Sequence, residues 1–269
     1  MVTIYQDYSD EPEDVFLPLP EDLACEFYAL EMGGFTEDIN FFEGLLPRQG
    51  TFLELGCGTG RIAQKLAEAE PSGRRIIGID ISTPMLRLAS RRDQSSKNLP
   101  GYVCMDMVQL AFSIDFDAIL IPYNTLNLLN SENKITECLN GCRKYLKPEG
   151  MLLVQLFIPS ENFIRQRKTF QFQMFDRPDG GKLIKELVKQ YEPLSQSVLI
   201  EERYRVRPLP TEKTKEDWNS VYSVAGFSVD KWLSLFSEAG FSMTNAYGDY
   251  SGCHYQSSPS SILIVHLTL

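Results

Sequence analysis

Residues 51–61 read TFLELGCGTGR, and this stretch decides how the rest of the chain is interpreted. An apolar run ends around Glu54, and Gly56, Gly58 and Gly60 follow at alternate positions. Apolar residues then recur at helical spacing, so the stretch predicts a strand, a tight turn and a helix. Glycine lets a backbone approach a ligand closely, and a helix start offers free N–H groups. We expect a small ligand to bind over this turn.

The spacing of these glycines separates two classes of ligand-binding loop. Dinucleotide-binding loops carry G-x-G-x-x-G. This chain has G-x-G-x-G instead, with an acid two residues before the first glycine. A tight turn that binds nothing is the alternative. The decision depends on residues further along the chain.

Composition excludes several classes of function. The chain has 269 residues, of which 43% are apolar and 23% charged, as is usual for a soluble globular protein. Its net charge of −10 disfavours nucleic-acid and anionic-membrane partners. No apolar run reaches the length of a membrane span and the N-terminus lacks a signal-peptide layout, so we expect a cytoplasmic protein. The six cysteines form no C-x-x-C pair, which predicts reduced thiols and no metal site.

Two later acids follow apolar strands. Residues 74–80 form a continuous apolar run that ends at Asp80, as expected for a parallel strand buried on both faces. The position of Asp80 suits the acid that binds ribose hydroxyls in nucleotide-binding folds, because a carboxylate can accept from both hydroxyls. Residues 101–107 predict a third strand that ends around Asp106. A helix-flanking acid and a surface turn acid are the respective alternatives.

The ordered set of motifs resembles one family. LELGCGTGR, GIDIS, CMDM, FDAILIPYN and LKPEGMLLV occur in this order across about residues 50–157. In the last of these motifs, residues 147–150 predict a turn into a fifth strand at residues 151–157. The set resembles class I, Rossmann-like S-adenosylmethionine (SAM)-dependent methyltransferases of the small-molecule type. The resemblance implies an α/β fold with a doubly wound, mostly parallel sheet of seven strands in the order 3-2-1-4-5-7-6, the seventh antiparallel. It also implies SAM as cofactor and S-adenosylhomocysteine as product.

The resemblance assigns roles to individual residues. Glu54 and the Gly56–Gly60 loop would hold the methionyl part, Asp80 the ribose, and Asp106 the adenine amino group. An N-terminal tyrosine, Tyr8, would close over the cofactor. The full set of expected cofactor-binding residues is Tyr8, Glu54, Gly56, Cys57, Gly58, Thr59, Gly60, Asp80, Ile81, Met85, Met105, Asp106, Met107 and Pro122.

The acceptor side is expected where the fourth strand ends, because ligands meet at that edge of open parallel sheets. Tyr123 and Asn124 follow this strand and are candidates for orienting an amine or hydroxyl. His254, in the loop at 248–260, is the candidate catalytic histidine. His266 lies in the last apolar strand, which favours a structural role.

Four parts of the chain are expected. Residues 1–49 form an N-terminal arm and helices, residues 50–157 the SAM-binding core, and residues 226–269 the end of the core. Residues 158–225 break the alternation of strand and helix, and they predict a small antiparallel β insertion. This insertion is expected to be a lid, a homodimer surface, or a stabilising sheet without substrate contact.

The resulting hypothesis is a SAM-dependent methyltransferase that acts on N or O of a small-molecule acceptor. Two alternatives remain: a protein or RNA methyltransferase, and a SAM- or nucleotide-binding protein without catalysis. The acidic charge and the absence of a D/N-P-P-Y/F motif after the fourth strand weigh against the first. The glycine spacing weighs against an NAD enzyme.

Overall fold

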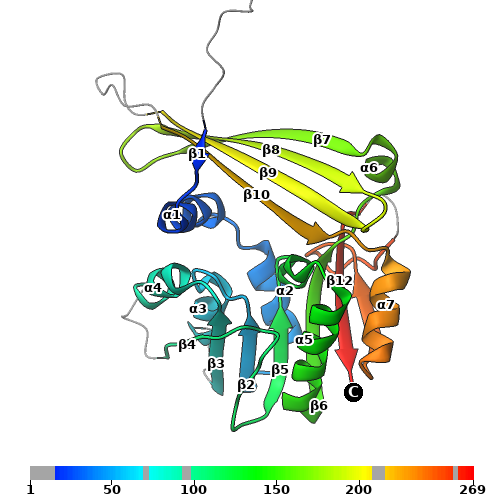
Figure 1. Ribbon diagram of the computed structural model, residues 1–269. Coiled ribbons are helices and arrows are strands. Elements are labelled where there is room, and N and C mark those ends of the chain that lie inside the picture. The colour runs from blue at the N-terminus through cyan, green and yellow to red at the C-terminus, as the bar shows by residue number, and fades with distance from the viewer. Residues whose placement is uncertain (1–15, 69–72, 93–97, 208–215, 257–259) are drawn as a thin grey trace, which may run out of the picture.

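The computed structural model describes residues 16–68, 73–92, 98–207, 216–256 and 260–269. These residues form a seven-stranded sheet flanked by helices and a separate five-stranded sheet (Figure 1). The five-stranded sheet lies across the carboxyl ends of the parallel strands, with α1 (Glu21–Met32) beneath it. None of the described helices has the length and apolar character needed to cross a membrane.

The seven-stranded sheet has the order β4-β3-β2-β5-β6-β12-β11, which confirms the predicted 3-2-1-4-5-7-6 arrangement. The first five of these strands are parallel to one another, and β12 runs antiparallel to both β6 and β11. The strand bounds are β2 Gln49–Leu55, β3 Gly73–Asp80, β4 Gly101–Cys104, β5 Phe116–Ile121, β6 Leu146–Phe157, β11 Ser242–Tyr247 and β12 Ile262–Thr268.

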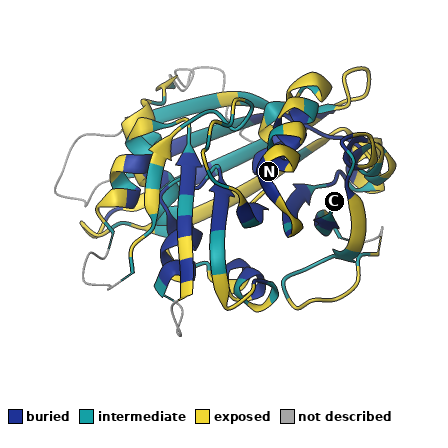
Figure 2. Ribbon diagram, turned by 90° about the horizontal axis from the view of Figure 1, so that it is seen from below, coloured by how far each residue is buried: buried dark blue, intermediate teal, exposed yellow. Residues whose placement is uncertain are grey.

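Both faces of this sheet are covered by helices because its central strands are apolar at successive positions. On β2, Phe52 packs with α2 (Glu37–Leu45) and α3 (Arg61–Glu68). The next residue, Leu53, faces the opposite cluster, which contains α5 (Glu132–Tyr145) and α7 (Val229–Glu238). Figure 2 shows the buried central strands in dark blue and the exposed outer faces of the helices in yellow. The fold therefore fixes β2 rigidly beneath the turn that follows it.

The five-stranded sheet has the order β1-β10-β9-β8-β7 and confirms the predicted antiparallel insertion. Its inner face packs on α1 through Phe27, Leu183, Tyr204 and Val206. The remaining elements are β1 Leu17–Pro18, α6 Glu161–Gln166, β7 Lys168–Asp176, β8 Lys182–Glu192, β9 Ser197–Arg207 and β10 Glu216–Ala225. Strand β1 pairs parallel to β10, so the segment before α1 belongs to the same sheet as the insertion.

Two strand ends differ from expectation. Strand β4 ends at Cys104 and not near residue 107. Asp106 instead starts a turn, because its Oδ1 and its carbonyl accept from the N–H groups of Val108 and Gln109. The expected turn at residues 147–150 is an irregularity inside β6. The register skips it, since Leu146 pairs with Phe116 and Met151 pairs with Ala118.

Candidate active site

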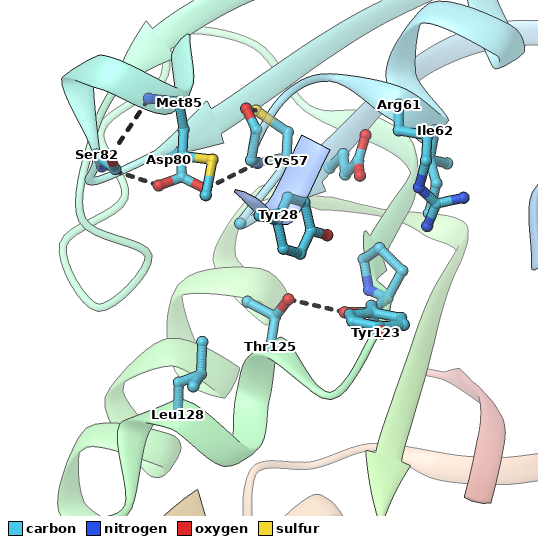
Figure 3. Close-up of a pocket in the computed structure, with 14 residues that line it drawn as sticks. Tyr28, Cys57, Arg61, Ile62, Asp80, Ser82, Met85, Tyr123, Thr125 and Leu128 are labelled. Atoms are coloured by element: carbon cyan, nitrogen blue, oxygen red, sulfur yellow. Dashed lines mark hydrogen bonds between the residues drawn. The ribbon is translucent and has the colours of Figure 1, made fainter. Parts of the chain in front are cut away.

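Two adjoining cavities lie at the carboxyl ends of β2, β3 and β5. The first has a volume of about 240 Å³ and the second about 530 Å³. Four residues line both cavities: Gly56, Asp80, Thr125 and Leu128. A ligand with two chemically different ends can therefore extend from one cavity into the other past Asp80. Figure 3 shows the side chains that line the first cavity.

The glycine turn separates β2 from α3. Gly56, Gly58 and Gly60 all have positive φ, at 67°, 53° and 71°. Gly56 also needs the absence of a side chain, because a Cβ there would lie 2.2 Å from Cγ2 of Thr125. The turn is fastened to the sheet by the Cys57 N–H, which donates to the carbonyl of Ile79 at 2.9 Å. The Cys57 side chain is buried, and burial raises the pKa of its thiol, so it is a poor nucleophile.

Asp80 is held by backbone groups on both of its oxygens. Oδ2 accepts from the N–H of Gly58 and Oδ1 from the N–H of Ser82, each at 2.8 Å (Figure 3). A carboxylate oxygen accepts more than one hydrogen bond, so both oxygens keep acceptor capacity toward the cavity. Ser82 in turn caps α4 (Thr83–Ser90) by accepting from the N–H of Met85. The fold thus presents an oriented bidentate acceptor.

The second cavity is a slot beside Asp80. Ile81, Met105, Asp106 and Met107 line it, together with residues at the start of α5. One oxygen of Asp106 is occupied by the N–H of Val108, at 2.9 Å. The methionines supply a polarisable apolar lining of the kind that suits a flat ring.

Glu54 is the buried acid of the first cavity. Its side chain is 2% exposed, and its Oε2 has no hydrogen-bond partner among the described residues. Burial raises the pKa of this carboxyl to about 8, although the nearby Arg61 guanidinium opposes the change. Arg61 itself is committed to a buried bidentate pair with Asp38, at 2.7 and 2.5 Å. The Glu54 carboxyl therefore lacks a full counter-charge, and a cationic ligand group would supply one.

The turn after β5 carries backbone strain. Tyr123 and Asn124 are both in the left-handed region, with φ of 50° and 61°. Neither is glycine, and residues in such conformations concentrate at functional sites. The Tyr123 N–H donates to Oε1 of Gln155 at 3.1 Å, which fixes the turn to β6. Oδ1 of Asn124 is buried and has no partner among the described residues.

Two neighbouring phenols line the first cavity. The rings of Tyr28, from α1, and Tyr123 meet edge to face with their centres 6.4 Å apart (Figure 3). Burial raises the pKa of both phenols, so each is a neutral hydrogen-bonding group at physiological pH. They can orient a bound substrate by hydrogen bonding. They are poor bases for removing its proton, because their phenolate forms are unfavourable here.

A buried charged cluster lies between α1 and the five-stranded sheet. Nζ of Lys185 on β8 is 2.8 Å from carboxylate oxygens of both Glu31 and Glu202. The phenol of Tyr204 also donates to Glu202, at 3.3 Å. The cluster ties α1, which supplies Tyr28, to the sheet that covers the strand ends.

Several predicted residues come together in this site. Those that line the first cavity are Glu54, Gly56, Cys57, Gly58, Asp80, Met85, Pro122 and Tyr123. Those that line the second are Gly56, Asp80, Ile81, Met105, Asp106 and Met107.

Other predicted residues lie elsewhere. Thr59, Gly60 and Asn124 line neither cavity. His254 is exposed and stacks on the ring of Tyr247 at 6.4 Å, so its loop does not bring it into either cavity. Tyr8 lies outside the described residues.

The sequence did not single out some of the lining residues. They are Tyr28, Arg61, Ile62, Ser82, Thr125 and Leu128 in the first cavity and Val108, Gln109, Leu129, Lys134 and Glu137 in the second. Arg61 directly follows the last glycine, so its position at the start of the helix could be predicted from the sequence. Tyr28 gave no such signal, because α1 is positioned by contacts that are distant in sequence. It packs on the five-stranded sheet, and Glu21 accepts from the hydroxyl of Ser82 at 2.7 Å.

The segment that contains the glycine turn and both strand-end acids matches a known family. Residues 52–150 match the family described as a methyltransferase domain. The chain therefore contains a segment that resembles a methyltransferase domain. The matched segment begins in β2 and ends in β6, so it includes the Gly56–Gly60 turn, Asp80 and Asp106 but not the five-stranded sheet.

Sequence relatives align over about the length of the methyltransferase domain. The putative methyltransferase YqeM of Bacillus subtilis is 38% identical over 114 residues, which are 42% of this chain and 44% of that protein. The cypemycin N-terminal methyltransferase of a Streptomyces species is 32% identical over 113 residues, which are 41% of this chain and 43% of that protein. The matches therefore span less than half of these relatives.

Solved structures resemble the chain beyond the methyltransferase domain. A SAM-dependent methyltransferase from Clostridium acetobutylicum has a TM-score of 0.73 and 16% identity, and covers 91% of this chain and 97% of its own. CalS10, an amino pentose methyltransferase from Micromonospora echinaspora, has a TM-score of 0.70 and 16% identity, and covers 96% and 100%. At these identities the likeness concerns the fold, which is that of class I SAM-dependent methyltransferases.

Proposed function

We propose that this chain transfers the methyl group of SAM to a nitrogen or oxygen atom of a small-molecule acceptor. The methyltransferase domain and the fold of SAM-dependent enzymes support the reaction. The description of CalS10 as an amino pentose methyltransferase with SAM bound supports a small acceptor.

The observation that carries the proposal is the carboxylate of Asp80. Its two oxygens are aimed by the N–H groups of Gly58 and Ser82, and the carboxylate lines both cavities. A ribose diol offers two adjacent donors, which is the pattern that an oriented carboxylate accepts. We assign the ribose to Asp80, the adenine to the Met105–Met107 slot, and the methionyl part to the first cavity.

Glu54 completes the methionyl end in this proposal. The α-ammonium of SAM would supply the counter-charge that the buried carboxyl lacks. The N–H groups at the start of α3 favour a negative group such as the α-carboxylate. Bound SAM supplies a methyl group on a sulfonium, which is an excellent leaving group. The chain's task is to place the acceptor in line with the methyl group and to exclude water.

The lining of the first cavity favours nitrogen as the acceptor atom. Among the described residues no histidine lines either cavity, and the phenols of Tyr28 and Tyr123 are neutral. A neutral amine attacks with its lone pair and can release its proton to water after the new N–C bond has formed and the C–S bond has broken. An alcohol needs a base during the transfer, because its oxygen is a weak nucleophile while protonated.

Calorimetric titration tests the cofactor assignment. We expect SAM and S-adenosylhomocysteine to bind and NAD to give no signal. Asp80→Ala should weaken SAM binding more than tenfold, because a hydrogen bond to a charged group contributes about 1.5–3 kcal/mol.

Asp117→Ala is the matched control. Asp117 also accepts from a backbone N–H, that of Thr51 at 2.8 Å. It lies at the amino end of β5, whereas the cavities lie at the carboxyl ends of the strands. This variant should bind SAM as the unaltered chain does, even where its stability is lower. Equal SAM affinity in the Asp80 and Asp117 variants would refute the ribose assignment, and NAD binding at the same site would refute the proposed function.

A further inference from the structure

Strand β7 leaves large apolar side chains in water at the edge of the five-stranded sheet. It is the last strand in the order β1-β10-β9-β8-β7, and its free edge has no partner strand within the described ranges. Phe170, Phe172 and Met174 alternate along it and are 62%, 55% and 53% exposed. All three point to the same face, since side chains two apart share a face. Such an edge strand is a template for pairing with another chain.

The other edge strands in the described parts of the two sheets are short or irregular, which makes β7 an exception. Strand β1 is two residues long and contains Pro18, and β4 has four residues. Strand β11 has a register irregularity between Met243 and Asn245. Short length, proline and bulges all discourage edge pairing. In contrast, β7 has nine residues, no proline and an unbroken register with β8.

The free backbone groups belong to the residues that carry the apolar side chains. The N–H of Tyr191 donates to the carbonyl of Arg167 at 2.8 Å, next to the register pair Lys168 and Gln190. Because hydrogen bonding alternates along an antiparallel strand, every second residue of β7 directs its N–H and C=O away from β8. These outward-facing residues are Lys168, Phe170, Phe172, Met174 and Asp176.

We propose that β7 pairs antiparallel with β7 of a second copy of this chain, about a two-fold axis at Phe172. The two five-stranded sheets then join into one sheet. In this register Phe172 lies opposite its own copy, and Phe170 lies opposite Met174. Lys168 of each strand lies opposite Asp176 of the other strand, so opposite charges face each other at both ends. A strand with this sequence is therefore complementary to itself.

Charge on the rest of the outer face disfavours packing the two sheets face to face. Inward of β7, the same face carries Glu186, Arg203, Arg205 and Asp217, as the register requires. Arg205 already pairs with Glu186 and Asp217 at 3.0 and 3.2 Å. Burying these groups beneath a second sheet would remove their water without offering new partners. Leu199 and Val221 are also exposed on this face, but the largest exposed apolar side chains, Phe170, Phe172 and Met174, lie on the edge strand.

Sedimentation velocity on the full chain tests the proposal. We expect the unaltered protein to form dimers at micromolar concentration. Phe172→Lys places two ammonium groups opposite each other at the two-fold axis, and should weaken dimerisation at least about a hundredfold while circular dichroism stays unchanged. Val221→Lys is the control, because Val221 is 55% exposed on the outer face but lies on β10, away from the edge. This variant should remain dimeric.

A charge-reversal pair tests the register itself. Lys168→Asp places an acid opposite Asp176 at both ends of the paired strands. Asp176→Lys places a lysine opposite Lys168 at both ends. Each variant alone should therefore dimerise at least about tenfold more weakly. Mixing the two variants should restore dimers, because every facing pair in the heterodimer is again opposite in charge.

Three outcomes would overturn the proposal. They are an unaltered chain that stays monomeric at about 100 µM, dimers that survive Phe172→Lys but not Val221→Lys, and variant mixtures that fail to recover dimers. The first would leave the edge to a different partner, and the second would indicate packing through the face of the sheet.

Discussion

The two sheets of this protein hold their charged residues in different ways. In the seven-stranded sheet the acids Asp80 and Asp106 follow strand ends, where backbone N–H groups orient them and leave acceptor capacity free. In the five-stranded sheet Lys185 and Glu202 lie in mid-strand and are satisfied by each other and by Glu31 of α1. The first arrangement is ready for a ligand. The second is formed by side chains that neutralise one another, although Oε1 of Glu31 is buried without a partner among the described residues, and it acts as a brace.

This difference predicts different responses to substitution. An acid held by backbone groups does not depend on another side chain, so its loss should affect ligand binding more than folding. A side-chain cluster fails as a unit, because removing one member leaves the others buried and unpaired. The following experiments test this contrast, and they are ordered by the size of the expected effect.

Lys185→Met should give the largest loss of stability. Lys185 is 9% exposed at its side chain, and its removal leaves Glu31 and Glu202 without their cation. Breaking such a buried pair costs about 3–5 kcal/mol. The loss should be smaller at pH 5 than at pH 8, because burial raises the pKa of Glu31 and low pH protonates it. Urea unfolding at the two pH values measures both effects.

Lys182→Met provides the control on the same strand. Lys182 pairs with Asp176 at the surface, with its side chain 48% exposed. An exposed pair contributes about 0–1 kcal/mol. Similar losses of stability in the two lysine variants would show that the cluster is not a brace.

Gly56→Ala and Gly58→Ala should differ although both glycines have positive φ. A Cβ at residue 56 would collide with Thr125, whereas a Cβ at residue 58 meets only Cε1 of Tyr28 at 3.8 Å. The left-handed conformation costs an alanine about 1–2 kcal/mol. Overpacking adds about 1–3 kcal/mol at residue 56 alone.

Thermal unfolding and SAM titration distinguish these two variants. Gly56→Ala should lose both stability and measurable SAM binding, since Thr125 lines both cavities. Gly58→Ala should show only the conformational cost in its unfolding temperature, and its SAM binding should weaken less than that of Gly56→Ala, because Gly58 lines the first cavity alone. Equal behaviour would mean that the space beside Gly56 is not required for the site.

Glu54 should affect stability through its pH dependence. Burial raises the pKa of Glu54 to about 8, above the usual range of a glutamate. Between about pH 4.5 and this value the folded state holds a proton that the unfolded state releases, so stability should fall as pH rises. Glu54→Gln should therefore flatten the decline of the unfolding temperature between pH 5 and pH 8.

Cofactor binding gives a second measurement on Glu54. If the α-ammonium of SAM pairs with this carboxyl, binding should release a proton near pH 7. Titrations in two buffers of different ionisation enthalpy would detect this proton, and Glu54→Gln should abolish its release. Identical proton release from the variant would assign it to another group.

The sequence was sufficient for the seven-stranded sheet and its strand order because each motif is local. The glycine turn, Asp80 and the apolar strands are encoded by neighbouring residues, and their order resembles a known family. The β insertion was also predictable, since alternating residues and the Asp179-Gly180-Gly181 turn mark its strands. Strand ends were less certain, because Asp106 terminates its strand by forming a turn with Val108.

The acceptor side could not be predicted in the same way. Tyr28 reaches the first cavity because α1 packs against the five-stranded sheet, and this long-range contact has no local signal. The aromatic and polar residues at 248–260 suggested His254 for catalysis, yet it stacks on Tyr247 outside both cavities. The charged cluster joins three separate elements through side chains whose partners are distant in sequence.

The paired left-handed residues Tyr123 and Asn124 have a consequence for engineering this protein. Each non-glycine residue in that conformation carries about 1–2 kcal/mol that a glycine would not. A screen for heat-resistant variants would therefore select glycine at this turn, and at Tyr123 it would discard the phenol that faces the first cavity. Thermal stability and turnover thus compete at residue 123, and selection for one alone should erode the other.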